Sequence, residues 1–336
     1  MARKRTVDEG HRITERELSA LEARVAREYI QADREIGKKL TTYFEQFAKQ
    51  DDAMKKRLKN EEITEKAYQQ WRADEMITGK QWQELREQIA KDYHELNTWA
   101  AGQSRETAAA VYAENINYGT YSVEKLSKIN TSFTLYNKDA VKNLLQNDPD
   151  ILPEPGAAVS EAIAAGKDIL WNRRQIQSVA LQGILQGESV LRLGKRLADT
   201  VGEKDYKAAV RNARTMATSA QNAGRIAAFE RAENMGIELE KMWIATLDGR
   251  TRHSHAAIDG EVVPTKAAFS NGLQYPGDMA PGNPGEVYNC RCTTIAVLKS
   301  IGRDLSRRSE KALGGMSYEE WKAYHTAKNE VKNGRL

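Results

Sequence analysis

Both cysteines of the chain stand two residues apart, in the segment "EVYNCRC". Two of its five histidines, His253 and His255, lie in the earlier segment "TLDGRTRHSH". Zinc in proteins usually takes four nitrogen or sulfur ligands, with carboxylate oxygen as a substitute. Cys290, Cys292, His255 and either His253 or Asp248 would supply that number, so metal binding is one chemistry that these residues offer.

The Cys-x-Cys spacing leaves three interpretations open. Side chains two positions apart converge on one target only where the backbone is extended or turned, so a shared target requires "NCRC" to be strand-like or turned. Cys290 and Cys292 then form a metal site, a reduced pair of small buried side chains, or a strained disulfide. If the cysteines are a reduced buried pair, His255 would cap or cross-link a turn through ordinary hydrogen bonds.

An enzymatic centre is the alternative from another functional class. A metal-dependent nuclease or transferase could be centred on Asp248, His255, Cys290 and Cys292, since nucleophilic and metal-assisted chemistry both use these residue types. However, no residue stands out as a general base. Asp248 and Asp259 are each followed by glycine, which is an ordinary turn signal. We therefore expect no enzymatic activity and assign no catalytic residue.

These residues lie in a segment, 241–298, whose composition differs from the rest of the chain. It holds four prolines between positions 264 and 284 and many glycines. Two runs, "MWIAT" and "CTTIAVL", are rich in residues that favour strands. We predict a compact, turn-rich α+β module here.

The region before it, residues 1–146, predicts long helices. Apolar residues recur at helical spacing from about 13 to 48, which indicates one long straight helix. Thr64 is predicted to cap a second helix, and Gly79 to mark the break before a third. The pattern loosens between 102 and 146, where we expect short helices.

A linker is predicted at residues 147–158, which hold three of the seven prolines and show no periodicity. Residues 159–240 then form a helical lead-in, with a break near Gly187 and a cap at Ser189. Its alanine-rich part has small side chains that permit close helix packing.

The segment 299–336 is a polar helical tail. Ser317 is its predicted cap, and Trp321 is expected to dock it onto the same chain or a neighbour. The predicted fold class is therefore mainly α with a small α+β module: long amino-terminal helices, a helical lead-in and a compact turn-rich C-terminal module.

Length and charge limit the class of protein. A chain of 336 residues can form two domains and a sizeable core. Its 51 basic and 47 acidic residues give a net charge of +4, too small to draw it onto nucleic acid or an anionic membrane. No apolar run follows the basic start, and no 18-residue apolar segment occurs, so we expect neither a signal peptide nor a membrane span. Two cysteines suit folding in a reducing cytosol.

Four motifs occur in order along the module: Asp-x-Arg-Thr-Arg-x-x-His, Asp-Gly, Tyr-Pro-Gly-Asp and Asn-Cys-Arg-Cys. Through them and the helices that precede them, residues 160–298 resemble the phage Mu F-like minor head protein family, also called phage head morphogenesis proteins. The motif residues are Asp248, Arg250, Thr251, Arg252, His255, Asp259, Gly260, Tyr275–Asp278, Asn289, Cys290, Arg291 and Cys292.

The resemblance implies a structural virion component. It would be a minor capsid protein, associated with the portal vertex and acting in head assembly and in DNA packaging or ejection. Its implied partners are the portal protein and capsid or scaffolding proteins, without a membrane span. Its implied location is the phage head interior or the portal vertex, after synthesis in the cytoplasm of the bacterial host.

The resemblance also bears on individual residues. Met216 stands where the family often has an acidic residue, so any role of that carboxylate is not carried over. His253 falls at a variable position. If the family's module binds a metal, the shared ligands would be His255, Cys290 and Cys292, with Asp248 as the better fourth ligand and zinc as the expected ion.

Phage DNA is a further candidate partner, through Arg250, Arg252 and Arg291. For these arginines we favour a structural role over phosphate contact, because guanidinium groups tie turns together through carboxylates such as Asp248 and Asp259.

Overall fold

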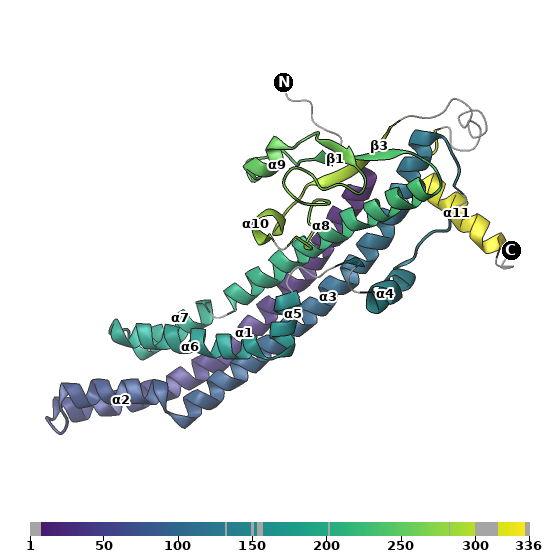
Figure 1. Cartoon of the computed structure of the whole chain (residues 1–336). Coiled ribbons are helices and arrows are strands. Elements are labelled where there is room, and N and C mark those ends of the chain that lie inside the picture. The colour runs from purple at the N-terminus through teal and green to yellow at the C-terminus, as the bar shows by residue number, and fades with distance from the viewer. Residues whose placement is uncertain are drawn as a thin grey trace. The chain divides into compact units, whose positions relative to one another are not determined.

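The computed structural model describes residues 8–131, 133–148, 151–152, 157–200, 202–281, 283–299 and 315–332, without the side chains of 157–160 and 327–332. Over these residues the chain is mostly helical, with a small antiparallel sheet near its C-terminal end (Figure 1). The predicted fold class is confirmed. The helices are α1 (Glu9–Lys59), α2 (Glu65–Ile77), α3 (Lys80–Ser127), α4 (Lys138–Asn147), α5 (Ala157–Ala164), α6 (Lys167–Leu185), α7 (Val190–Thr200), α8 (Glu203–Asn234), α9 (His253–Ala257), α10 (Pro284–Val287) and α11 (Tyr318–Lys332).

The chain divides into two compact units, each assembled from separate stretches of sequence. Unit 1 comprises Met1–Leu21, Gln103–Pro155 and Arg211–Leu336, and unit 2 comprises Glu22–Gly102 and Gly156–Val210. Helices α1, α3 and α8 contribute residues to both units. The division into five consecutive segments that the sequence suggests stays a prediction.

In unit 2, the predicted apolar stripe of the first helix is buried. Val25, Tyr29, Ile36, Leu40 and Phe47 have almost no exposed surface in α1, which confirms the stripe. The helix extends beyond the predicted range at both ends.

The predicted helix boundaries of unit 2 are also confirmed. Thr64 caps α2 by accepting a hydrogen bond from a backbone N–H of the first turn, and α3 begins directly after Gly79. α6 ends before Gly187, whose φ of +71° is a conformation that glycine adopts without strain. Ser189 accepts a hydrogen bond from a backbone N–H in the first turn of α7.

α3 is longer than the sequence predicts, and the expectation of short helices between 102 and 146 is wrong for most of that range. The helix continues to Ser127, and only α4 is short. Unit 1 buries this part of α3 on several faces, so no single apolar stripe marks it as a helix. Its buried apolar residues are Ala108, Ala109, Val111, Tyr112, Ala113, Ile116, Tyr121 and Val123.

In unit 1, α3 and α8 pack closely through small residues. A side chain added at Gly224 of α8 would place its Cβ 2.6 Å from the backbone oxygen of Tyr112. One added at Gly119 of α3 would lie 2.7 Å from the Cβ of Ala228. The predicted close packing of the alanine-rich helix is therefore confirmed.

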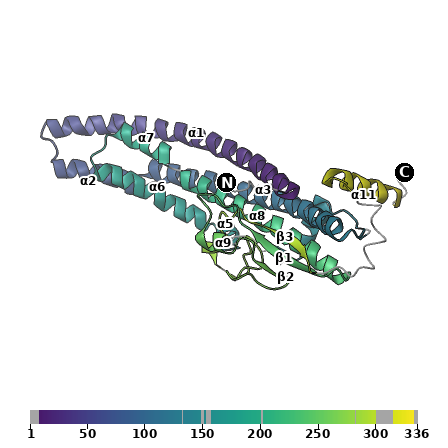
Figure 2. The same ribbon diagram turned by 90° about the horizontal axis from the view of Figure 1, so that it is seen from above.

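The sheet of unit 1 has three antiparallel strands in the order β2-β1-β3, as Figure 2 shows from above. The strands are β1 (Leu239–Ile244), β2 (Val262–Pro264) and β3 (Thr293–Leu298). Both predicted β-prone runs contribute strands, β1 and β3, while the short β2 was not foreseen. Side chains of β1 alternate between buried and half-buried, with Lys241 and Trp243 fully buried.

Helix α11 docks onto other parts of unit 1 through Trp321, as the sequence predicts for this residue. Trp321 has no exposed surface, and its indole N–H donates a 2.6 Å hydrogen bond to Oε2 of Glu124. Ser317 precedes the helix and accepts from the backbone N of Glu320, which confirms the predicted cap.

Two predicted segments lie partly outside the described residues. In the linker at 147–158, these are residues 149–150 and 153–156, and in the tail at 299–336 they are 300–314 and 333–336. Among the helices of the described residues, none has both the length and the apolar character that crossing a membrane requires.

Candidate metal centre

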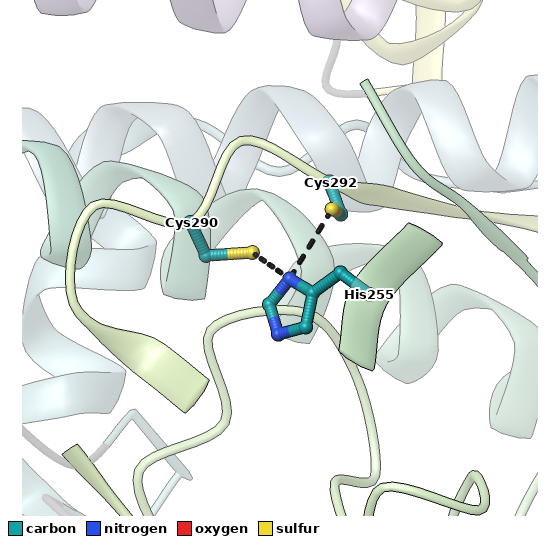
Figure 3. Close-up of side chains that lie close together, drawn as sticks. All are labelled: His255, Cys290 and Cys292. Atoms are coloured by element: carbon teal, nitrogen blue, oxygen red, sulfur yellow. Dashed lines mark hydrogen bonds between the residues drawn. The ribbon is translucent and has the colours of Figure 1, made fainter. Parts of the chain in front are cut away.

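His255 and the two cysteines lie together inside unit 1 (Figure 3). Nδ1 of His255 is 3.6 Å from Sγ of Cys290 and 3.5 Å from Sγ of Cys292. All three side chains are buried, with at most 3% of their surface exposed, and both cysteines are free thiols. Among the described residues, this is the one group of three or more histidines, cysteines or carboxylates whose ligand atoms gather within 4.8 Å.

A short helix places His255. α9 begins directly after Arg252, whose guanidinium donates a hydrogen bond to the backbone oxygen of Tyr288, close to the cysteines. The His255 ring meets the Trp243 ring edge to face, with the ring centres 5.1 Å apart. His253 is on the same helix but exposed, so the structure brings only one of the two candidate histidines to the cysteines.

A tight turn places the cysteines. Asn289 has a φ of +56°, a left-handed conformation that asparagine tolerates better than most residues. The backbone N–H of Cys290 donates to the oxygen of Val287, at the end of α10. The "NCRC" segment is therefore turned rather than part of a strand, and β3 begins directly after Cys292.

Helix α8 holds this turn through a row of buried polar side chains. Thr218 donates a 2.6 Å hydrogen bond to the backbone oxygen of Cys290, and Asn222 donates one of 3.2 Å to that of Cys292. Asn222 also accepts from the backbone N of Thr294 at 2.9 Å. These bonds satisfy backbone groups that burial would otherwise leave unpaired.

Glu286 and Ser254 complete the surroundings of His255, and the sequence did not single out either residue. Oε2 of Glu286 lies 2.9 Å from Nε2 of His255, at ion-pair distance but not aligned as a hydrogen bond. The hydroxyl of Ser254 donates to the same carboxylate at 2.9 and 3.1 Å. The sequence offered one signal that could have indicated Glu286, namely an acidic residue four positions before Cys290.

The two thiols differ in acidity because they face each other. Contact with Cys292 raises the pKa of Cys290, and burial raises it further. The hydrogen bond from Cys290 and then that with His255 lower the pKa of Cys292 to about 5, against the effect of burial. Of the two sulfurs, that of Cys292 therefore loses its proton more readily, and the thiolate is the form in which cysteine binds metals.

Asp248 lies outside the cluster and binds an arginine. Its two oxygens accept hydrogen bonds of 2.5 and 2.6 Å from Arg291, and its backbone turn is closed by Thr251. These bonds from Arg291, followed by that from the Arg250 backbone, hold the pKa of Asp248 well below its usual range. The structure thus does not bring Asp248 together with His255 and the cysteines.

The other motif residues shape turns. Asp259 accepts a 2.9 Å hydrogen bond from the backbone N of Ala245, and Gly260 has a φ of +84°. Asp278 accepts from the backbone N of Gln274 at 2.9 Å. A Cβ at Gly277 would lie 2.9 Å from the backbone N of Ser219, so this turn approaches α8 more closely than a side chain permits.

The module is similar to known phage proteins. Residues 174–295 match the family described as phage Mu protein F like protein. The chain is 27% identical over 219 residues to minor head protein GP7 of Bacillus phage SPP1, a match that covers 62% of this chain and 68% of that protein. No solved structure matches.

Two bacterial relatives are longer. The chain is 32% identical over 228 residues to a protein of Enterococcus faecalis named NAD(+)--arginine ADP-ribosyltransferase EFV, covering 67% of this chain. It is 31% identical over 190 residues to an uncharacterized protein of Haemophilus influenzae, covering 55% of this chain. The chain spans 45% and 39% of the lengths of these two relatives. The motifs, the family match and the likeness to GP7 agree: residues 174–295 of the chain are similar to the phage Mu F-like minor head proteins.

Proposed function

We propose that this chain is a structural minor capsid protein of a phage head, located in the head interior or at the portal vertex. The observation that carries the proposal is the family match over residues 174–295, together with the likeness to a named minor head protein over 68% of its length. The host cytoplasm is the proposed site of synthesis.

The way in which the motif residues are used supports a structural role. Asp248, Asp259 and Asp278 each accept hydrogen bonds from backbone N–H groups of turns, and Asn289 supplies a left-handed turn residue. Most of the family motif therefore builds the module itself, rather than presenting reactive groups to a substrate.

The proposed partners are the portal protein and capsid or scaffolding proteins, and the proposed roles are head assembly and DNA packaging or ejection. Contact with phage DNA would use Arg250, Arg252 or Arg291. Arg291 is engaged by Asp248 and Arg252 by a backbone oxygen, whereas Arg250 is 79% exposed and has its nearest carboxylate contact at 4.0 Å.

Co-expression with the portal protein of the same phage tests the proposal. We expect the full chain to co-elute with the portal in size-exclusion chromatography at a fixed ratio, and not with the portal of an unrelated phage. The chain should also be present in heads purified from infected cells. Its absence from those heads, together with failure to bind the portal, would reject the proposed function.

An ADP-ribosyltransferase is the second candidate, favoured by the name of one relative. The chain spans only 45% of that protein, so the activity does not transfer with the match. Incubation of the full chain with a labelled NAD analogue and an arginine-rich acceptor decides the point. We expect no transfer of label to the acceptor, and transfer above that of a heat-denatured sample would favour the enzyme.

The nuclease alternative requires Asp248 to act with His255, Cys290 and Cys292, and the structure holds Asp248 apart from them. Substitution His255→Ala distinguishes the two functions. We expect loss of folding or of incorporation into heads. A folded and incorporated variant that lacks only a DNA-cleaving activity would show that the centre is catalytic.

A further inference from the structure

We propose that Cys290, Cys292 and His255 form a zinc site in which Glu286 fixes the histidine. The ligand atoms are the two Sγ atoms and Nδ1 of His255. Glu286 is a positioning residue that acts through Nε2 of the ring. The carboxylate at the centre is therefore that of Glu286, and not that of Asp248, which the sequence suggested as a ligand.

The distances between the ligand atoms fit a tetrahedral metal. Zinc–sulfur bonds of about 2.3 Å and zinc–nitrogen bonds of about 2.0–2.1 Å at a tetrahedral angle place sulfur and nitrogen roughly 3.6 Å apart. The two Nδ1–Sγ distances are 3.5 and 3.6 Å. A single Nδ1 lone pair can accept one thiol hydrogen well, but here both sulfurs approach that atom equally closely. A shared metal accounts for the symmetry.

The environment of the histidine also fits a metal ligand. Histidines that bind zinc through one ring nitrogen usually direct the other toward a carboxylate or a carbonyl, which fixes the ring and its tautomer. Here the sulfurs are at Nδ1 and the Glu286 carboxylate is at Nε2. The Ser254 hydroxyl donates to that carboxylate, with its one hydrogen shared between the two oxygens. Glu286 thus faces Nε2, whereas a metal held by the two sulfurs would bind Nδ1. The carboxylate can therefore orient the ring but cannot be a ligand of the same metal.

The donor set selects the metal. Two thiolates and an imidazole are soft and borderline donors, which suit zinc better than magnesium or calcium. Three protein ligands leave one of the four tetrahedral positions to a ligand from outside the set.

A metal here would hold together a module with little core of its own. The buried apolar cluster around the site is small, consisting of Trp243, Ala245, Phe269, Leu273, Val287, Cys290 and Cys292. The ligands belong to two segments, with His255 standing 35 and 37 residues before the cysteines. Joining such segments is how structural zinc contributes to folding.

Metal analysis of the purified full chain tests the site directly. We expect about one zinc per chain by elemental mass spectrometry, with both thiols protected from a thiol reagent until a chelator is added. Reconstitution with Co²⁺ should give thiolate-to-cobalt charge-transfer absorption. A chain that neither contains nor binds Zn²⁺ or Co²⁺, and whose thiols react equally with and without Zn²⁺, would overturn the proposal.

Variants separate the roles of the residues. His255→Gln and Cys290→Ser should abolish stoichiometric binding, whereas His253→Gln, on the same short helix but exposed, should bind as the wild type does. Glu286→Gln should keep the cobalt spectrum but weaken zinc affinity about 10–100-fold. The matched control Glu238→Gln, at an exposed position, should have no effect.

If Glu286→Gln leaves the affinity unchanged, the carboxylate does not position the ring and that part of the inference fails. Should the cysteine variants not fold, chelator competition on the wild-type chain gives the affinity without them. None of these measurements requires a phage head. Failure of the zinc site can therefore be distinguished from failure of the proposed function.

Discussion

The guanidinium of Arg225 donates hydrogen bonds of 2.6 and 2.9 Å to the two carboxylate oxygens of Asp8, which precedes it by 217 residues. Arg225 is almost fully buried in α8. Its other N–H groups reach Oδ1 of Asn115 at 3.1 Å and the backbone oxygen of Thr294 at 3.0 Å. One side chain thus joins the start of α1 to α3 and β3 within unit 1.

Substitution Asp8→Asn should destabilise unit 1 because it leaves a buried guanidinium without its counter-charge. Burial raises the pKa of Asp8, but the nearby Arg225 outweighs it and the net shift is downward, so the carboxylate is ionised at neutral pH. We expect a loss of about 3 kcal/mol in the free energy of unfolding, measured by urea denaturation. The control is Glu9→Gln, whose partner Arg12 is 66% exposed and which should cost less than about 1 kcal/mol. Equal losses would refute a special role for the buried pair.

Two glycine-to-alanine substitutions should have opposite effects. Gly224→Ala places a Cβ 2.6 Å from the Tyr112 backbone oxygen and should destabilise by about 1–3 kcal/mol through overpacking. Gly102→Ala, inside α3, brings the new Cβ within 4 Å of no atom beyond the adjacent residues and the helix's own backbone, and should stabilise by up to about 1 kcal/mol through helix propensity. Thermal unfolding midpoints of the two variants give the comparison. A loss of stability at Gly102 would contradict the propensity argument.

Substitution Trp321→Ala should release α11. The side chain is fully buried, packs near Phe133 and Tyr121, and donates to Glu124, so its removal should cost about 3–5 kcal/mol of local stability. Hydrogen exchange of the amides of residues 318–326 should become at least about 100-fold faster. Tyr324→Ala, at a position that is 42% exposed, should leave the exchange close to that of the wild type. Unchanged protection in the tryptophan variant would show that other contacts hold the helix.

The stability of unit 1 should depend on alkaline pH through Lys241. This side chain has no exposed surface, and its ammonium donates to the backbone oxygen of Gln274 at 2.7 Å. Burial lowers the pKa of Lys241 to about 8, against the opposing charges of Glu230 and Asp278. The unfolded value is about 10.4, so between pH 8 and 10.4 the unfolded chain binds more protons. The penalty for burying the charge is therefore full below pH 8 and is relieved as the pH rises.

Comparison with Lys241→Met isolates this effect from other titrating groups. The free energy of unfolding of the wild type minus that of the variant should rise with pH between 8 and 10.4, by up to about 3 kcal/mol. The same difference for Lys266→Met, at an exposed position, should stay flat. A flat or falling curve for Lys241 would mean that the buried amine keeps its proton in the folded state.

Short-range patterns in the sequence were sufficient to predict several structural features. The stripe of α1, the cap at Thr64 and the docking role of Trp321 all depend on residue type and short-range spacing, and the structure agrees with each. The pattern failed for α3 beyond residue 102. A helix buried on several faces has no single stripe, and its small and polar residues then look like those of a loop.

At the candidate site, the sequence could indicate which residue types meet but not which neighbours they choose. A metal site at His255, Cys290 and Cys292 was one of three interpretations that the sequence left open. The three side chains meet only because the chain turns at Asn289. The contact with Glu286 depends on how α9 and α10 face each other, which no short-range spacing encodes. Asp248 was the expected fourth ligand, but it has a bidentate arginine partner in Arg291.

The pairing of Asp8 with Arg225 has a consequence for folding during synthesis. At roughly 5–20 residues per second, a ribosome takes about 10–40 s to make the intervening chain. During that time, the first turn of α1 has none of the Arg225 contacts that later hold it. Unit 1 can therefore close only after β3 has been made, and such long-range closure is intrinsically slow.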